Sequence, residues 1–109
     1  MADRDDWVSV LPASAVQPGE IKGAKLPNGD TIAVYNIAGR FYATADSCTH
    51  EEASLSEEGL LDGGIVECGR HFGAFEVATG EPKAPPCTEV LKTYPVAVRD
   101  GQVCVRVSG

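Results

Sequence analysis

Two short clusters constrain this chain more than any other feature, because they hold both of its histidines and two of its four cysteines. The first cluster is Cys48-Thr49-His50, and the second is Cys68-Gly69-Arg70-His71. Each supplies one thiolate and one imidazole, and both groups bind metals. A fold that brings the clusters together would hold a metal centre with four candidate ligands: Cys48, His50, Cys68 and His71.

The spacing inside each cluster separates the possible kinds of metal site. A zinc finger usually pairs cysteine with cysteine and histidine with histidine, as C-x₂₋₄-C followed by H-x₃₋₅-H. Here each half is mixed, as C-x-H and then C-x₂-H. The mixed pattern matches a [2Fe–2S] centre in which two histidines replace two cysteines on one iron. A tetrahedral Cys₂His₂ zinc site uses the same ligand types and is the alternative, and a chance placement without metal is the third interpretation.

The stretch from Cys48 to Cys87, CTHEEASLSEEGLLDGGIVECGRHFGAFEVATGEPKAPPC, resembles the Rieske-type ferredoxins of bacterial aromatic ring-hydroxylating dioxygenases. The likeness continues through LKTYPVAVRDGQVCV, residues 91–105. It implies one Rieske-type [2Fe–2S] cluster per chain. It also implies that Cys48 and Cys68 bind the inner iron, and that His50 and His71 bind the outer iron.

The resemblance implies an electron carrier that is not itself an enzyme. Such a carrier would take single electrons from an NAD(P)H-dependent flavin reductase and deliver them to a terminal aromatic-ring-hydroxylating oxygenase. No histidine remains for the two-histidine, one-carboxylate iron site of an oxygenase, and no nucleotide-binding glycine pattern or P-loop is present. A Rieske-like small subunit of another oxidoreductase, such as a nitrite reductase, and a zinc-stabilised binding module are the alternatives.

The net charge argues against two classes of binding partner. The net charge is −7, which disfavours binding to nucleic acid and to an anionic membrane surface. No apolar run has the length of a membrane span, and no secretory signal is visible, so we expect a cytoplasmic protein. We also expect a monomer. In a reducing compartment, Cys87 and Cys104 are expected to be free thiols.

Four acidic residues lie beside the candidate ligands: Glu51, Glu52, Glu57 and Glu58. They are either solvated loop residues or residues that steer the ligand-bearing end of the protein toward basic partners.

Short strands at turn spacing predict an all-β antiparallel sandwich or small barrel in a single domain, residues 1–109. Thr31 to Ile37 is apolar on both faces and predicts a buried strand that forms a hairpin with residues 40–44 across Ala38-Gly39. A last hairpin is expected from one strand over 91–98 and another over 102–107, with Pro95 at an edge or bulge. The resemblance adds the Rieske fold, with a cluster-binding subdomain over about 44–87. The Pro85-Pro86 loop either covers one side of the cluster or is a turn between strands.

Overall fold

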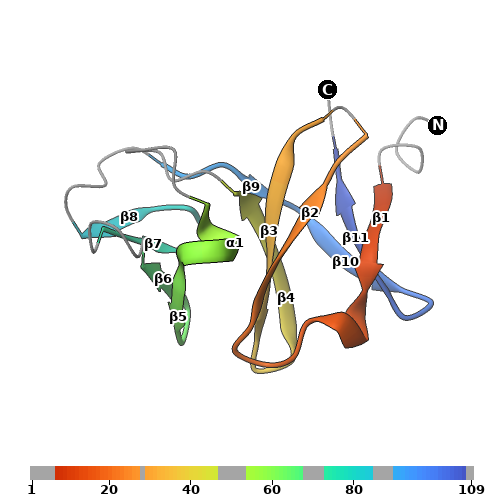
Figure 1. Ribbon diagram of the computed structural model, residues 1–109, viewed down its shortest axis with the longest axis horizontal. Coiled ribbons are helices and arrows are strands. Elements are labelled where there is room, and N and C mark those ends of the chain that lie inside the picture. The colour runs from red at the N-terminus through yellow and green to blue at the C-terminus, as the bar shows by residue number, and fades with distance from the viewer. Residues whose placement is uncertain (1–6, 28, 47–53, 68–72, 85–89, 108–109) are drawn as a thin grey trace.

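A computed structural model describes residues 7–27, 29–46, 54–67, 73–84 and 90–107. Its strands form three antiparallel sheets, ordered β1-β11-β10, β2-β3-β4-β9 and β5-β6-β7-β8 (Figure 1), so the predicted all-β antiparallel class is confirmed. A 3₁₀ turn at Ala13–Ala15 and the short helix α1 (Leu55–Glu58) accompany them. The strands are β1 (Trp7–Pro12), β2 (Ile21–Lys25), β3 (Thr31–Ile37), β4 (Arg40–Ala45), β5 (Leu60–Asp62), β6 (Ile65–Glu67), β7 (Ala74–Glu76), β8 (Pro82–Ala84), β9 (Thr93–Tyr94), β10 (Val96–Arg99) and β11 (Gln102–Arg106).

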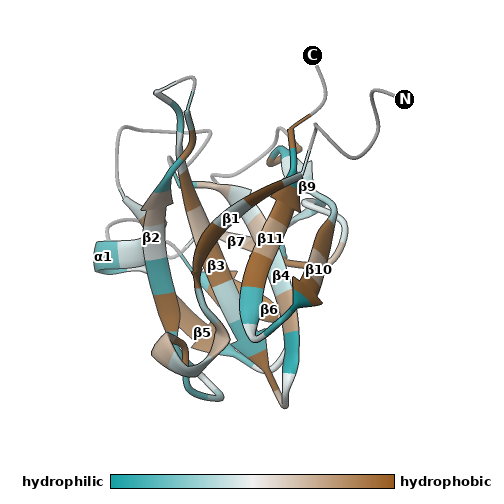
Figure 2. Cartoon of the chain, turned by 90° about the vertical axis from the view of Figure 1, so that its right-hand side faces the viewer, coloured by the Kyte–Doolittle hydropathy of each residue, from teal (hydrophilic) through white to brown (hydrophobic). Residues whose placement is uncertain are grey.

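Strand β3 lies at the centre of the molecule and is buried on both faces, as its continuous apolar sequence predicts. Ile32 and Val34 on one face join a cluster with Val103 and Val105 of β11. Ala33 and Tyr35 on the other face join a second cluster with residues of α1, β6 and β7. The middle sheet therefore has an apolar core on each side, and Figure 2 shows hydrophobic residues along β1, β3, β10 and β11.

The two predicted hairpins close through two-residue turns with positive φ at both positions. Ile37 pairs with Arg40 across Ala38-Gly39, and Arg99 pairs with Gln102 across Asp100-Gly101. Positive φ at both positions is typical of the type I′ turn, whose twist matches that of the strands. Both turns therefore set the strand register locally.

The prediction of one continuous strand over residues 91–98 was wrong. The segment forms two strands in different sheets: β9 pairs with β4, and β10 pairs with β11. Pro95 lies between them and has no N–H for a sheet ladder, so the strand is interrupted there. Its carbonyl accepts a hydrogen bond of 3.0 Å from the Arg106 N–H, which fixes the chain at the point where it changes sheets.

The hairpin turn at Ala38 offers a test of backbone strain. Ala38 is exposed and has φ 54°, a region that asparagine tolerates better than alanine. Ala38→Asn should therefore raise the free energy of unfolding by up to about 1 kcal/mol, and Ala38→Val should lower it. Thermal unfolding followed by far-UV circular dichroism measures both. A lower melting temperature for Ala38→Asn would contradict this explanation.

Candidate metal centre

All four candidate ligands lie outside the described residues, in segments 47–53 and 68–72. The expectations for Glu51, Glu52, the Pro85-Pro86 loop and Cys87 also fall outside them. The structure does describe the residues from which these segments begin and to which they return. The site is therefore built from its framework: the end of β4 and the start of α1, and the ends of β6, β7 and β8.

Segment 47–53, which contains Cys48 and His50, begins after Asp46 and ends before Ser54. These two flanking residues are hydrogen-bonded: the Ser54 hydroxyl donates to Asp46 Oδ2 at 2.6 Å. The Ser56 N–H donates to Asp46 Oδ1 at 2.8 Å, and the Leu55 N–H donates to the Asp46 carbonyl at 2.7 Å. The base of the first ligand segment is therefore closed by short hydrogen bonds.

Strand pairing closes the base of the second ligand segment. Glu67, the last residue of β6, pairs with Ala74, the first residue of β7, and residues 68–72, with Cys68 and His71, lie between these strands. Ala74 also pairs with Ala84, after which segment 85–89 begins. Segments 68–72 and 85–89 thus leave the β5-β6-β7-β8 sheet from the same end.

One apolar cluster holds these framework elements together. Leu55 follows the first ligand segment, Val66 precedes the second, and Phe75 follows the second; each is fully buried. They pack in the cluster that includes Tyr35 of the central strand. Because each side chain is two or three residues from the nearest ligand segment, the hydrophobic core holds the described residues that flank the two segments in fixed positions.

A buried polar pair lies beside this core. The Tyr35 hydroxyl and Thr44 Oγ1 are 2.8 Å apart, and Thr44 Oγ1 donates to the Ala45 carbonyl at 2.8 Å. Burial raises the pKa of Tyr35 above its ordinary value, and the nearby Asp46 carboxylate adds to the increase. Tyr35 therefore stays protonated where an exposed phenol would ionise, and it supports the end of β4 rather than supplying a titrating group.

No sequence pattern assigns a role to Asp46, which lies two residues before Cys48. The signal that could have found its partner is the pattern Ser54-x-x-Glu57, which is typical of a helix N-terminus. Ser54 is indeed the N-cap of α1, and its hydroxyl accepts a hydrogen bond of 3.3 Å from the Glu57 N–H. No local pattern indicates that the same hydroxyl donates to Asp46.

The donor set fits an iron–sulfur centre, and the described residues offer no competing metal site. Within the described ranges, no group of three or more histidine, cysteine or acidic residues could hold a metal. The described cysteine, Cys104, is a free thiol buried in β11, in keeping with its expected state. None of the described helices is long and apolar enough to cross a membrane. Two thiolates and two imidazoles thus remain the chain's candidate donors, a set that suits iron or zinc.

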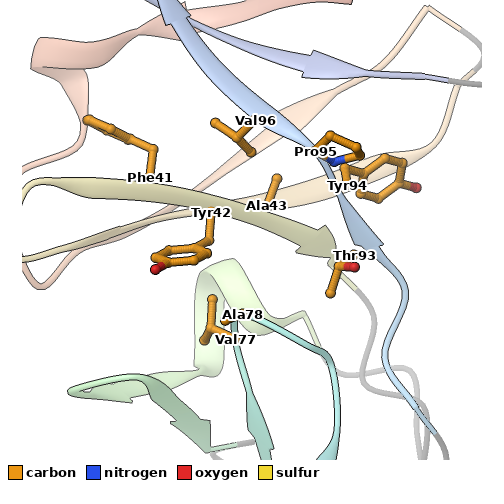
Figure 3. A pocket seen from close by; sticks show the side chains of 9 residues that line it. All are labelled: Phe41, Tyr42, Ala43, Val77, Ala78, Thr93, Tyr94, Pro95 and Val96. Carbon is orange, nitrogen blue, oxygen red and sulfur yellow. The ribbon is translucent and has the colours of Figure 1, made fainter.

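A surface pocket of about 330 Å³ lies between β4 and the turn after β7. Figure 3 shows Tyr42 pointing toward Val77 and Ala78, whereas Phe41 points to the other side of β4. The other residues that line the pocket come from β4 and from the segment of β9 and β10: Ala43, Thr93, Tyr94, Pro95 and Val96. The lining carries no carboxylate, imidazole, thiol or amine, so the pocket has no acid–base or nucleophilic chemistry comparable to that of the ligand clusters.

Comparison with known proteins extends the similarity over nearly the whole chain. Residues 6–95 match the model of the Rieske [2Fe-2S] domain. The chain is 48% identical over 105 residues to the ferredoxin component of the p-cumate 2,3-dioxygenase system of Pseudomonas putida, covering 96% of this chain and 89% of that protein. It is 46% identical over 93 residues to the biphenyl dioxygenase ferredoxin subunit of Pseudomonas sp. (strain KKS102), covering 85% and 84% of the two chains.

Solved structures agree with this similarity. The Sphingomonas yanoikuyae B1 ferredoxin superposes with a TM-score of 0.87 at 39% identity, covering 93% of this chain and 98% of that one. A chain in the complex of reduced oxygenase and oxidized ferredoxin of carbazole 1,9a-dioxygenase gives a TM-score of 0.86 at 46% identity, with 93% of each chain covered. Both matches leave little of either chain unaligned.

Proposed function

This chain belongs to the Rieske [2Fe-2S] domain family, and we propose that it is the ferredoxin component of an aromatic-ring-hydroxylating dioxygenase system. Its cofactor is accordingly a Rieske-type [2Fe–2S] cluster, which accepts and releases one electron at a time. The zinc alternative lacks this support. We propose Cys48 and Cys68 as ligands of one iron, and His50 and His71 as ligands of the other, because these positions match the ligation pattern.

The observation that carries the proposal is that the alignment with the p-cumate ferredoxin covers most of both chains. The p-cumate ferredoxin is covered over 89% of its length, so it has little room for a further catalytic domain. By contrast, in a solved structure of carbazole-bound oxygenase and ferredoxin, the chain covers only 29% of a longer chain, at 26% identity. The relatives that this chain covers nearly in full are named ferredoxin components, which supports an electron-transfer role.

We propose single-electron transfer from an NAD(P)H-dependent flavin reductase to a terminal oxygenase. The oxygenase side is supported by the solved oxygenase–ferredoxin complex of a relative. The reductase side is supported by the sequence, which has no nucleotide-binding motif and so needs another protein to oxidise NAD(P)H. We further propose that residues 1–109 form one domain in which about 44–87 bind the cluster.

Two measurements test this function. The dithionite-reduced protein should show the EPR signal of a histidine-ligated [2Fe–2S] centre, whereas a protein that contains zinc would be EPR-silent. The chain should then restore product formation to a p-cumate 2,3-dioxygenase assay in which reductase and oxygenase are present and the ferredoxin is omitted. A cluster-containing chain that fails both with these partners and with those of the biphenyl system would refute the proposed role.

Charge is distributed unevenly along the chain. Residues 46–90 contain ten acidic and two basic side chains, more than enough to account for the net charge of −7. This segment includes α1 and the β5-β6-β7-β8 sheet, at the left of Figure 1. Glu57 and Asp62 are both exposed there. We infer that the acidic segment attracts partners with a basic docking surface.

The electron-transfer rate should therefore depend on salt. The second-order rate constant for reduction of the cluster by its reductase should fall about tenfold as ionic strength rises from about 20 mM to about 500 mM, because salt screens exposed charges. Glu57→Gln should lower the rate at low salt, and Glu20→Gln, which lies outside the acidic segment, should not. Stopped-flow absorbance measures these rates. A salt-independent rate constant would leave the glutamates as solubilising charge.

A further inference from the structure

Asp46 connects three elements at the base of the first ligand segment. Its carboxylate accepts hydrogen bonds from the Ser54 hydroxyl and the Ser56 N–H, at 2.6 and 2.8 Å. Its backbone N–H donates to the Thr31 carbonyl at 3.1 Å, and its carbonyl accepts from the Leu55 N–H at 2.7 Å. The residue is only 7% exposed. Asp46 thus joins the start of β3, the end of β4 and the start of α1.

Capping alone does not account for this arrangement. Ser54 already caps α1 by accepting from the Glu57 N–H, and α1 is only four residues long. Asp46 precedes segment 47–53 in the sequence, and Ser54 and Ser56 follow it. The two hydrogen bonds of the carboxylate therefore join the two ends of that segment. Closing the loop through the protein removes conformational freedom that the metal would otherwise have to remove on binding.

The partners of Asp46 are themselves held in place. Leu55 is fully buried in the core beside Tyr35 and Val66. Helix α1 packs closely on β2: a Cβ built at Gly23 would lie 2.8 Å from Ser56 Oγ. The carboxylate therefore ties the two ends of segment 47–53 to a packed base. Loss of this tie would leave the Ser56 N–H without its acceptor, and the Ser54 hydroxyl with only the Ser56 hydroxyl, 3.1 Å away.

We propose that Asp46 is a positioning residue for the cluster: its carboxylate fixes the base of segment 47–53 so that Cys48 and His50 reach the metal in the correct geometry. This inference rests on the proposed ligand assignment. The carboxylate also places a negative charge two residues before Cys48, and a negative charge near a redox centre disfavours the added electron. The charge therefore lowers the reduction potential.

Three variants of the holoprotein separate geometry from charge. Asp46→Ala removes both, and Asp46→Asn keeps an acceptor for the Ser56 N–H but removes the charge. Ser54→Ala keeps the charge but removes the 2.6 Å bond together with the cap on α1. The first readout is the rate at which the visible absorbance of the oxidised cluster disappears with excess chelator. The second is the reduction potential from protein-film voltammetry. Asp62→Asn, which neutralises an exposed acid in β5, is the matched control.

We expect Asp46→Ala to lose the cluster about ten- to a hundredfold faster than wild type, the usual effect of removing a partner that orients metal ligands. Ser54→Ala should also lose it faster, by a smaller factor. Asp46→Asn should keep the cluster within about threefold of the wild-type lifetime but have a higher potential, while Asp62→Asn changes neither quantity.

Wild-type cluster lifetimes in both Asp46→Ala and Ser54→Ala would overturn the proposal. So would a faster loss that occurs only together with a lower temperature for unfolding of the sheets, with potential and EPR signal unchanged in every variant. If Asp46→Ala does not fold, Ser54→Ala and Asp46→Asn still decide the question. Failure of the ligand assignment is distinguishable, because it would show as a retained cluster in His50→Ala.

Discussion

Replacing His50 or His71 by alanine should leave the chain without its [2Fe–2S] cluster. The chain has only two histidines, so no third imidazole can take the vacant position on the iron. An iron that loses one protein ligand is open to solvent and to hydrolysis of the cluster. We expect iron and acid-labile sulfide to fall to a small fraction of the wild-type content in either variant, together with loss of the visible absorbance.

Neighbouring residues in the same segments supply the controls. Thr49→Ala and Arg70→Ala change residues inside the two motifs without removing a proposed ligand, and both should retain the cluster. Metal analysis distinguishes iron from zinc in the same samples. Wild-type iron and sulfide content in either histidine variant would refute the assignment of that histidine as a ligand.

Gly80→Ala should be the most damaging substitution among the described glycines. Gly80 has φ 79°, and a Cβ built there would overlap the Leu91 carbonyl oxygen. The Leu91 N–H donates to the Gly80 carbonyl at 2.8 Å, and Leu91 is fully buried in the core that holds the ligand segments. Because the clash is with backbone, side-chain rotation cannot relieve it. We expect a loss of about 3 kcal/mol or more of stability.

Gly19→Ala separates the clash from the cost of positive φ. Gly19 has φ 88°, but nothing lies within 4 Å of a Cβ built there. It should therefore lose only about 1–2 kcal/mol. For a domain of this size, the melting temperature should fall by about 12 °C or more in Gly80→Ala and by about 4–8 °C in Gly19→Ala. Equal decreases would mean that the backbone conformation, and not the contact with Leu91, limits substitution at Gly80.

Much of the fold could be predicted from local sequence. Residues Ile32 to Tyr35 of β3 are apolar without interruption, which indicates a strand buried between two layers. The pairs Ala38-Gly39 and Asp100-Gly101 mark hairpins because glycine readily takes positive φ. Pro95 was recognised as incompatible with a regular ladder, but the sequence could not say whether the chain would bulge or change sheets. The chain changes sheets because β10 pairs with the edge of β11, and the position of that edge is set by the tertiary structure.

The sequence by itself also determined the candidate ligands, since Cys48, His50, Cys68 and His71 are recognisable from residue type and spacing alone. Only the tertiary structure decided how their segments are supported. Glu67, Ala74 and Ala84 form one row because of strand register, and the Asp46 carboxylate meets Ser54 because β4 and α1 pack against the same core. The ability to bind a metal is a property of single side chains and can be recognised in the sequence. The supporting contacts join residues from separate elements, so they exist only after packing and hydrogen bonding have placed those elements together.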